Sequence, residues 1–315
     1  MKFSIIIPAK NEEANIGHCL DSILGVDFDR SQYEVIVIDN GSSDRTPSIA
    51  REKGAMVHEK PELTIAAMRN FGARVAQGEV LAFLDADCTV PASWLSEASR
   101  YLSHSDVVCF GSPPTIPRDA TWVQKSWFRV RCKSRQVEDV QWLESMNMFV
   151  RREAFDAVGG FNEDLVTCED YDLSLRLAKR GRIVSDGRIV AVHHGEAATV
   201  KQFFRKELWR GTSNLTGIRS HGFSWKELPS VLFPLVYLLC LSAVFLWLPA
   251  GIFVGRGVID LVLLLLLAGW QVPIFAMAIW KQRGEFSLTG AFQLHLLLNV
   301  YFLARGSSLL QRDPG

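Results

Sequence analysis

Long apolar runs that stop abruptly at polar turn residues recur along the first part of the chain. Residues 3–10 (FSIIIPAK) and 33–44 (YEVIVIDNGSSD) each begin as a nearly continuous apolar run. Runs of this length, bounded by turn residues, are typical of strands that are buried on both faces. Residues 55–60 and 80–87 predict a third and a fourth strand on the same grounds.

Helical patterns lie between these strands. We expect helices in residues 11–24, with Asn11 as a cap, in residues 46–54, which Gly54 ends, and in residues 63–78. Alternation of strands and helices predicts an α/β fold with a parallel sheet. Ligands of such sheets bind beyond the carboxyl ends of the strands.

The most informative segment is residues 80–88, VLAFLDADC, in which a buried strand ends in Asp85 and Asp87. Side chains two positions apart on a strand point the same way, so these carboxylates repel unless a cation or a proton lies between them. Mg²⁺ and Mn²⁺ suit such oxygen ligands and complete their shell with water and diphosphate oxygens. Alternatively, the aspartates cap the helix predicted from residues 91–102.

Two more polar clusters follow strands, Pro8–Glu12 and Asp39–Asp44, and both should lie at the same sheet edge as Asp85 and Asp87. Local roles explain some of these residues taken singly. Glu12 could interact favourably with the dipole of the first helix, and Asp44 could cap the second. Asp39 ends an otherwise apolar strand and has no obvious local role.

The charges are distributed unevenly, although 34 basic and 34 acidic residues balance over the 315 positions. Between Leu228 and Trp280 the only charged residues are Arg256 and Asp260. Residues 228–248 and 257–280 each exceed the roughly 20 apolar residues that cross a bilayer, so the sequence predicts two transmembrane helices.

A third apolar segment, residues 286–304, contains Gln293, His295 and Asn299. It could span the membrane, lie at its interface, or pack its polar groups against neighbouring helices, and we favour a third span. The sequence thus predicts a multi-pass protein of the cell (inner) membrane.

Two features of the sequence indicate the same orientation of the chain relative to the membrane. No signal-peptide pattern precedes the first strand, and Lys281 and Arg283 follow the second apolar segment. We therefore expect the N-terminal domain in the cytoplasm. The six cysteines include no C-x-x-C pair, so neither a zinc site nor a disulfide framework is indicated.

Basic and aromatic residues alternate in residues 199–227, among them Arg205, Trp209 and Arg210. This chemistry suits nucleic acid or a membrane surface. The neighbouring apolar segments favour membrane lipids and an acceptor as partners, and no nucleic acid. The predicted organisation is a catalytic domain (1–198), amphipathic interfacial helices (199–227), a transmembrane region (228–305) and a polar tail (306–315).

Four ordered motifs between residues 3 and 195 carry a family resemblance: SIIIPAKNEEANI, VIVIDNGSSDRT, RNFGARVAQGEVLAFLDADC and GGFNEDLVTCEDYDLSLRLAKRG. Together they resemble the inverting family 2 glycosyltransferases, which have a GT-A fold with a Rossmann-like, mostly parallel sheet. The resemblance implies a nucleotide-diphosphate sugar donor, a divalent metal (Mn²⁺ or Mg²⁺) and inversion at the anomeric carbon. With the apolar segments, it implies a lipid-linked or glycan acceptor and a role in cell-envelope or polysaccharide biosynthesis.

The resemblance also implies roles for individual positions. Asp85 and Asp87 would bind the metal and the diphosphate, and Arg69 and Asn70 would lie near the donor phosphate or ribose. The nucleoside pocket would be lined by Pro8, Lys10, Glu12, Asp39 and Asp44.

Single-displacement transfer needs a carboxylate that accepts the proton of the acceptor hydroxyl. The family motif points to Asp170 for this role, and Glu169 is the alternative. Periodicity leaves open whether the residues after them form a helix or a strand. His193 and His194 should point to opposite faces of a strand, and His193 could be a further ligand of the metal or diphosphate.

Residues 204–211, FRKELWRG, do not match the Gln-x-x-Arg-Trp motif of processive synthases in this family. This departure favours transfer of one sugar at a time. Two other functions compete with this interpretation: a catalytically silent membrane scaffold that binds nucleotide sugar, and a nucleotidyltransferase.

Overall fold

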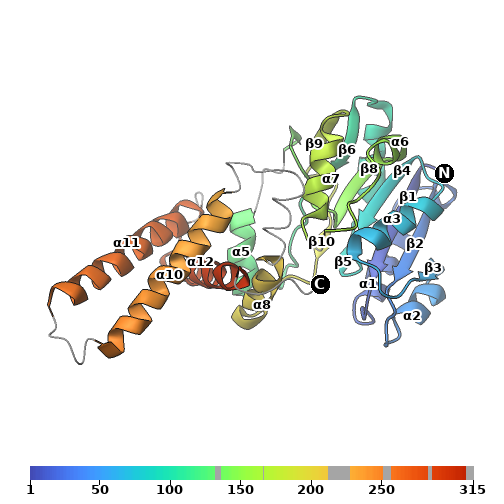
Figure 1. Cartoon of the computed structure of the whole chain (residues 1–315). Helices are drawn as coiled ribbons and strands as arrows, with labels where there is room; N and C mark the ends of the chain where they lie inside the picture. Colours follow the sequence, from blue (N-terminus) through green and yellow to red (C-terminus); the bar gives the residue numbers. More distant parts are fainter. Residues whose placement is uncertain (132–135, 166, 212–227, 251–256, 283–285, 310–315) are drawn as a thin grey trace. The chain divides into compact units, whose positions relative to one another are not determined.

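The computed structural model describes residues 1–131, 136–165, 167–211, 228–250, 257–282 and 286–309 (Figure 1). The chain forms two compact units. The first comprises residues 1–118 and the described part of 132–196, and the second comprises residues 119–131 and the described part of 197–315.

An eight-stranded sheet forms the centre of the first unit, in the order β3-β2-β1-β4-β8-β6-β9-β7. The pairs β1–β2, β1–β4, β2–β3 and β6–β9 are parallel, whereas β8 pairs antiparallel with β4 and β6. The strands are β1 (Phe3–Ala9), β2 (Tyr33–Asp39), β3 (Met56–Glu59), β4 (Val80–Leu84), β6 (Val107–Gly111), β7 (Glu138–Asp139), β8 (Asn147–Arg151) and β9 (Arg182–Ser185). The predicted α/β class and the first four predicted strands are confirmed.

Helices cover both faces of this sheet because successive residues of a buried strand point to opposite sides. Ile5 and Ile7 pack against α1 (Ile16–Leu24) and α4 (Trp94–Ser99), whereas Ile6 packs on the side of α3 (Ile65–Val75) and α7 (Glu169–Leu177). Figure 1 shows α3 and α7 on the same side of the sheet. The shorter helices of the unit are η1 (Arg30–Gln32), α2 (Thr46–Glu52), η2 (Arg100–Ser103) and α6 (Arg152–Ala157).

The first helix begins later than the sequence indicates. Asn11 does not cap it, since α1 begins at Ile16 and Asn11 has a left-handed backbone with φ of 55°. The side chain of Asn11 instead accepts a hydrogen bond from the Ser43 amide, which ties the loop after β1 to the loop after β2. The residues after Glu169 form a helix, which decides between the two alternatives that periodicity left open.

A two-stranded antiparallel ribbon stands apart from the main sheet. It joins β5 (Cys88–Thr89) to β10 (Val192–His193), with His193 opposite Cys88 in the register. The ribbon therefore brings the segment after Asp87 beside the two histidines.

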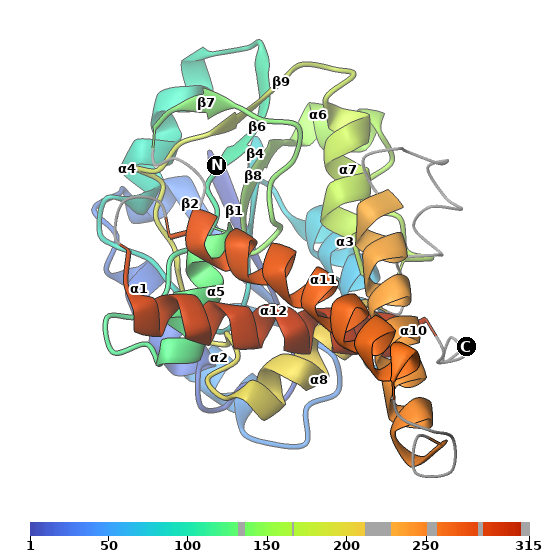
Figure 2. The same ribbon diagram turned by 90° about the vertical axis from the view of Figure 1, so that its left-hand side faces the viewer.

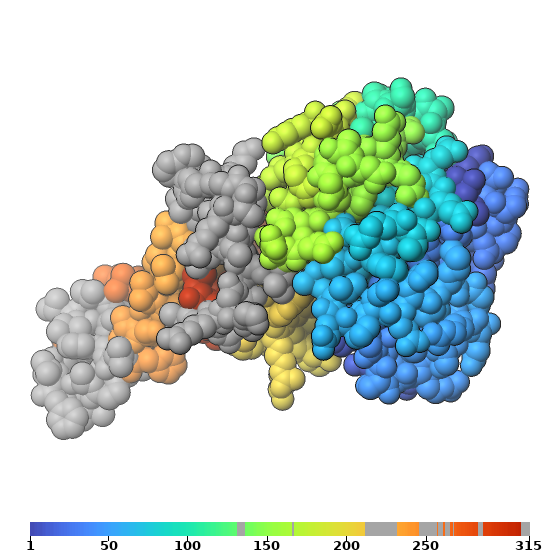
Figure 3. Space-filling model, turned by 45° about the vertical axis from the view of Figure 1, so that its right-hand side comes forward, coloured from blue at the N-terminus to red at the C-terminus, as the bar shows by residue number. Residues whose placement is uncertain are grey.

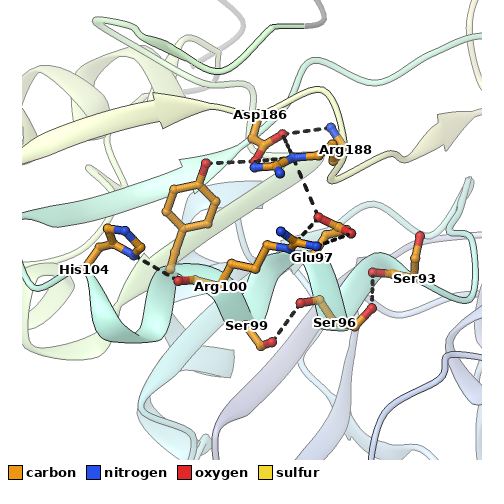
Figure 4. Close-up of polar contacts among 9 residues, drawn as sticks. Ser93, Ser96, Glu97, Ser99, Arg100, His104, Asp186 and Arg188 are labelled. Carbon is orange, nitrogen blue, oxygen red and sulfur yellow. Dashed lines mark hydrogen bonds and ion pairs between the residues drawn. The ribbon is translucent and has the colours of Figure 1, made fainter.

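Figure 4 shows a polar cluster between α4, η2 and the turn after β9. Asp186 is fully buried and accepts hydrogen bonds from the Tyr101 hydroxyl (2.8 Å) and from Arg188 Nη2 (2.6 Å). Arg188 also faces Glu97 at 3.7 Å. Burial raises the pKa of the Asp186 carboxyl, but hydrogen bonds from Arg188 and Tyr101 outweigh it and lower the pKa. The cluster thus links α4 and η2 to the turn after β9.

The described part of the second unit is helical: α5 (Trp122–Arg131), α8 (Val200–Gly211), α10 (Leu228–Ala250), α11 (Val258–Trp280) and α12 (Leu288–Ser308). Helix α12 lies beside each of the other four (Figure 2). Trp127, Phe203, Tyr237, Ile274 and Leu294, one from each helix, belong to a single apolar core.

The prediction of a multi-pass membrane protein is wrong for the structure as described. Within the described residues, no helix has both the length and the apolar content that a bilayer crossing requires. Apolar side chains of α10 and α11 form part of the core of the helical unit, including Tyr237, Ile274 and Ala278. Composition alone does not distinguish a helix that is buried in protein from one that is buried in lipid.

The favoured third span in residues 286–304 is likewise wrong, since α12 is one of the described helices that do not meet the requirements for a crossing. The segment instead packs its polar groups against its neighbours, which is one of the other two alternatives. Asn299 Oδ1 accepts hydrogen bonds from the Tyr237 hydroxyl and from Gln271 Nε2, both at 2.8 Å. Residues 212–227 of the predicted interfacial helices and residues 310–315 of the predicted polar tail lie outside the described residues.

Candidate active site

The carboxyl ends of β1, β2 and β4 form the frame of the candidate site. Their parallel register places Ala9 opposite Asp39 and Ile6 opposite Phe83. The loops that follow these strands therefore leave the sheet at one edge. Pro8 is buried within β1, and Lys10 is exposed just beyond it.

Hydrogen bonds lock the loops after β1 and β2 together. Buried Asp39 accepts hydrogen bonds from the amide and the hydroxyl of Ser42, at 2.9 and 2.5 Å. Asp44 accepts from the amides of Thr46 (2.9 Å) and Glu13 (3.1 Å), so it orders both the start of α2 and the loop after β1. Desolvation raises the pKa of Asp44, but a hydrogen bond from the Thr46 hydroxyl and those from the two amides outweigh it and lower the pKa.

The pKa of Glu12 is affected by carboxylates in the other two loops. Partial burial raises its pKa, a hydrogen bond from Asn15 opposes the change, and the negative charges of Asp87, Asp85 and Asp44 raise it further. Carboxylates that affect one another in this way lie close in space. The three polar clusters thus converge, as the strand order predicts.

Asp85 and Asp87 lie in the turn between β4 and β5, with side chains 27% and 19% exposed. They do not cap the next helix, because Ser93 occupies the N-cap of α4. Asp85 Oδ1 accepts a hydrogen bond from Arg69 Nη2 at 2.9 Å, and Asp87 Oδ2 lies 3.2 Å from His193 Nε2. Each aspartate thus has a different neighbour.

Arg69 and Asn70 are both buried on α3 and both bind other parts of the protein. Arg69 Nη1 donates to Glu169 Oε1 at 2.7 Å, so its guanidinium bridges Asp85 and Glu169. Asn70 Nδ2 donates to the carbonyl of Phe161 at 2.9 Å, and its Oδ1 accepts from the Phe161 amide at the same distance. Asn70 therefore holds the turn that precedes the acidic motif.

Glu169 and Asp170 begin helix α7, where carboxylates interact favourably with the helix dipole. Asp170 accepts hydrogen bonds from the amides of Tyr171 (2.7 Å) and Ser145 (3.3 Å). Burial is the main cause that raises the pKa of Asp170 to about 7; the negative charges of Glu169 and Glu144 act in the same direction, and Arg69 acts against it. Asp170 can therefore gain and lose a proton near neutral pH.

The two histidines after β9 differ in their surroundings. His193 is 4% exposed and lies between Asp87 and Glu196, whose Oε1 is 3.2 Å from Nδ1. His194 is exposed, and its Nε2 lies 2.9 Å from Thr89 Oγ1. Of these two histidines, only His193 has its side chain beside a carboxylate of residues 85–87 (Asp-Ala-Asp), which we call the DAD turn.

The remaining predicted residues belong to α8 in the second unit. Arg205 and Trp209 are exposed, whereas Arg210 Nη1 donates to the buried Glu207 at 2.8 Å. Arg305 of α12 also pairs with Glu207, at 2.9 Å. Arg210 thus takes part in packing α8 against α12.

Sequence reasoning missed three residues at this edge of the sheet: Glu144 and Ser145, which adjoin Asp170, and Glu196, which adjoins His193. Glu144 and Ser145 precede β8 and carry no local motif. Glu196 could have been found, since it follows His193 by three positions in the segment HHGE.

The donor atoms around Asp87 suit a divalent metal, although in the described residues no group of three or more His, Cys, Asp or Glu side chains is arranged to hold one. A Cβ atom at Gly195 would lie 1.8 Å from Asp87 Oδ2, so the absence of a side chain leaves the space that this carboxylate fills. Carboxylate oxygens suit Mn²⁺ and Mg²⁺, and an imidazole nitrogen beside them favours the softer Mn²⁺.

Comparison with known proteins finds a family model that is similar to the N-terminal part of the chain. Residues 4–159 match the family described as Glycosyl transferase family 2. The chain is 31% identical over 189 residues to glycosyltransferase AglE of Haloferax volcanii, covering 56% of this chain and 62% of that protein. It is 30% identical to beta-monoglucosyldiacylglycerol synthase of Trichormus variabilis, covering 55% of this chain and 40% of the synthase. The chain thus spans less than two thirds of the length of these relatives.

Solved structures share the fold. A mannosyltransferase from Pyrobaculum calidifontis, solved with GDP-Man and Mn²⁺, superposes with a TM-score of 0.61 at 21% identity, over 95% of this chain and 85% of that one. TarS residues 1–349 from S. aureus, solved with UDP-GlcNAc, gives 0.52 at 18% identity, over 98% and 92%. The fold is therefore that of GT-A-like enzymes.

Proposed function

We propose that the protein, whose residues 4–159 match the family described as Glycosyl transferase family 2, transfers a sugar from a nucleotide-diphosphate donor to an acceptor hydroxyl, with inversion at the anomeric carbon. One observation carries the proposal. The buried Asp170, with a pKa of about 7, adjoins Glu169, which Arg69 links to Asp85 at the end of β4. The residue that we propose as the proton acceptor is thus the chain neighbour of a residue that is linked to the acidic turn after β4.

The proposed reaction is a single displacement. The acceptor oxygen forms a bond to the anomeric carbon as the bond from that carbon to the diphosphate oxygen breaks. Asp170 takes the proton of the acceptor hydroxyl, a role for which a pKa near the working pH is suited. Glu169 is the alternative for this role, but its carboxylate forms the ion pair with Arg69 that links it to Asp85.

We assign the donor to the loops after β1, β2 and β4. Pro8, Lys10, Glu12, Asp39 and Asp44 are the proposed nucleoside contacts. Asp85, Asp87 and His193 would hold the divalent metal, with donor diphosphate oxygens as its further ligands. When bound, the ion would neutralise the charge that develops on the departing nucleoside diphosphate. Mn²⁺ in the mannosyltransferase from Pyrobaculum calidifontis supports this assignment.

We propose that the acceptor is lipid-linked. The name of one relative and the exposed apolar side chains of the second unit support this choice. One relative is named as a glucosyldiacylglycerol synthase. The second unit exposes several large apolar side chains, among them Leu239 (60%), Phe245 (66%), Val272 (67%) and Trp280 (63%), whose chemistry suits acyl chains. Arg205, Trp209 and Arg210 of α8 are candidates for contact with the acceptor.

The test is a panel of UDP- and GDP-sugars with the purified full chain, with Mn²⁺ or with EDTA, and with diacylglycerol, glycolipid or soluble glycan as acceptor. We expect metal-dependent release of nucleoside diphosphate from one donor and a glycosylated lipid product. Release of pyrophosphate from a nucleoside triphosphate and a sugar phosphate would instead identify a nucleotidyltransferase. Donor binding without turnover on any acceptor would support the silent scaffold.

A further inference from the structure

The HHGE segment, residues 193–196, is held in a fixed register against the DAD turn. His193 pairs with Cys88 in the β5–β10 ribbon, and the His194 amide donates to the Asp87 carbonyl at 2.9 Å. These backbone contacts place the His193 ring beside the Asp87 side chain. The second ring nitrogen, Nδ1, lies on the side of the ring away from Asp87, and its neighbour there determines the orientation and tautomer of the ring.

Glu196 lies behind the ring. His193 Nδ1 is 3.2 Å from Glu196 Oε1, and Nε2 is 3.2 Å from Asp87 Oδ2. All three side chains are largely buried, with 5% exposure for His193, 19% for Asp87 and 12% for Glu196. A carboxylate thus adjoins each ring nitrogen.

A neutral imidazole has one N–H donor and one lone pair. If Nδ1–H donates to Glu196, the Nε2 lone pair faces the Asp87 carboxylate, and two lone pairs at this distance repel unless a cation lies near both. Carboxylates behind the ligating histidine are a common device of metal sites, because they fix the tautomer and orientation of the ring.

We propose that Glu196 is a positioning residue that holds the His193 ring with Nε2 unprotonated and directed, together with Asp87, at the divalent cation. This inference rests on the proposed function, and it assigns to Glu196 no contact with the donor or the metal. The proposal also explains why Gly195 and Glu196 follow the two histidines. Gly195 leaves room for the Asp87 carboxylate, and Glu196 orients the histidine beside it.

The first experiment measures Mn²⁺ affinity of the full chain with UDP or GDP present, from the electron paramagnetic resonance signal of free Mn²⁺. We expect Glu196→Ala to weaken binding about 10- to 100-fold, the range typical for such supporting residues. Glu196→Gln should lose less, since its amide oxygen can still accept from Nδ1–H. His194→Gln is the matched control and should bind Mn²⁺ like the wild type, because its ring contacts Thr89 instead.

A second measurement does not depend on a variant that folds. Nitrogen-15 NMR of the wild-type imidazole, with diamagnetic Mg²⁺ and the nucleoside diphosphate, should show His193 protonated at Nδ1 and unprotonated at Nε2. A proton on Nε2 under these conditions, or Mn²⁺ affinity of Glu196→Ala equal to that of the wild type, would overturn the inference. Wild-type protein that transfers no sugar from any donor would instead defeat the proposed function, so the two failures are distinguishable.

Discussion

Arg69 and Glu169, one hundred positions apart, form a buried ion pair in which Nη1 lies 2.7 Å from Oε1. The second guanidinium nitrogen binds Asp85 at 2.9 Å. Arg69 thus joins the middle of α3 to the first residue of α7 and to the end of β4. Figure 3 shows α3 in light blue bordering the yellow-green α7 at the surface of this unit. The acidic motif of α7 is therefore held against the DAD turn by one side chain.

Replacing Arg69 by Met should destabilise the fold. The change leaves Asp85 and Glu169 without their shared cation, and breaking a buried pair typically costs about 3–5 kcal/mol. Arg69→Lys should recover only part of the loss, because one ammonium cannot reproduce the fork that binds two carboxylates. Urea unfolding at pH 7.5 measures both variants.

The matched control for this prediction is Arg51→Met, which removes an exposed ion pair with Glu59. Exposed pairs contribute within about 1 kcal/mol, so its unfolding midpoint should stay close to that of the wild type. Equal midpoints for Arg69→Met and Arg51→Met would show that the bridge between α3 and α7 contributes little.

The role of Asp170 as a base predicts the pH dependence of transfer. The carboxylate accepts a proton only when ionised, and burial together with the charges of Glu169 and Glu144 raises its pKa to about 7. The rate kcat/KM should therefore fall as the pH drops below about 7 and reach a plateau above it. Asp170→Asn should reduce transfer by at least about 100-fold, the usual contribution of a positioned base.

Glu144→Gln tests the cause of the raised pKa. Removing a negative charge near Asp170 should lower its pKa, so the acidic limb of the rate profile should move to lower pH. Glu153→Gln, on the exposed start of α6, should leave the limb in place. A limb that both variants leave unchanged would assign the titration to another group.

The sequence predicts that the residues of the candidate site lie at the carboxyl edge of the parallel sheet. It does not predict most of the side chains with which they form hydrogen bonds and ion pairs. Apolar runs that end at Asp39 and Asp85 place both residues at the carboxyl ends of parallel strands. Nothing local reveals that Arg69 faces Glu169, because that pairing depends on how two helices pack on the same side of the sheet. The roles assigned to Glu12 and Asp170 remain predictions. The strand order indicates the position of Glu12, whereas only the family motif points to Asp170.

The helical unit shows that apolar composition alone does not reliably predict membrane-spanning helices. Residues 228–248 and 257–280 are apolar enough to suggest membrane spans, yet in the described residues α10 and α11 share a core with α12. The polar residues of α12 gave the better indication, since Asn299 binds Tyr237 and Gln271 of the neighbouring helices. Hydrogen bonds of a side-chain amide to neighbouring helices indicate helix packing, which an average of hydropathy over the segment does not register.

Asp170→Asn should also change how stability depends on pH. In the folded protein the pKa of Asp170 is raised, so the native state binds its proton more tightly than the unfolded state does between about pH 4 and 7. That contribution is present at low pH and is lost as the pH rises through about 7. The variant should therefore gain stability relative to the wild type at pH 8 and less at pH 5, as urea unfolding at both values would reveal. A smaller gain at pH 8 than at pH 5 would contradict a raised pKa.

Gly195→Ala should disrupt the metal side of the site without unfolding the domain. The new methyl group would lie 1.8 Å from Asp87 Oδ2 and 3.2 Å from His193 Nε2, so the Asp87 carboxylate must move. We expect Mn²⁺ affinity and transfer to fall together by at least about tenfold, while the unfolding midpoint changes little. Gly17→Ala is the control, since its added Cβ would meet only Ile49 at 3.6 Å, an ordinary contact. It should keep full activity, and Ala is the better helix former in α1. Normal Mn²⁺ binding by Gly195→Ala would show that Asp87 does not need its present position to hold the ion.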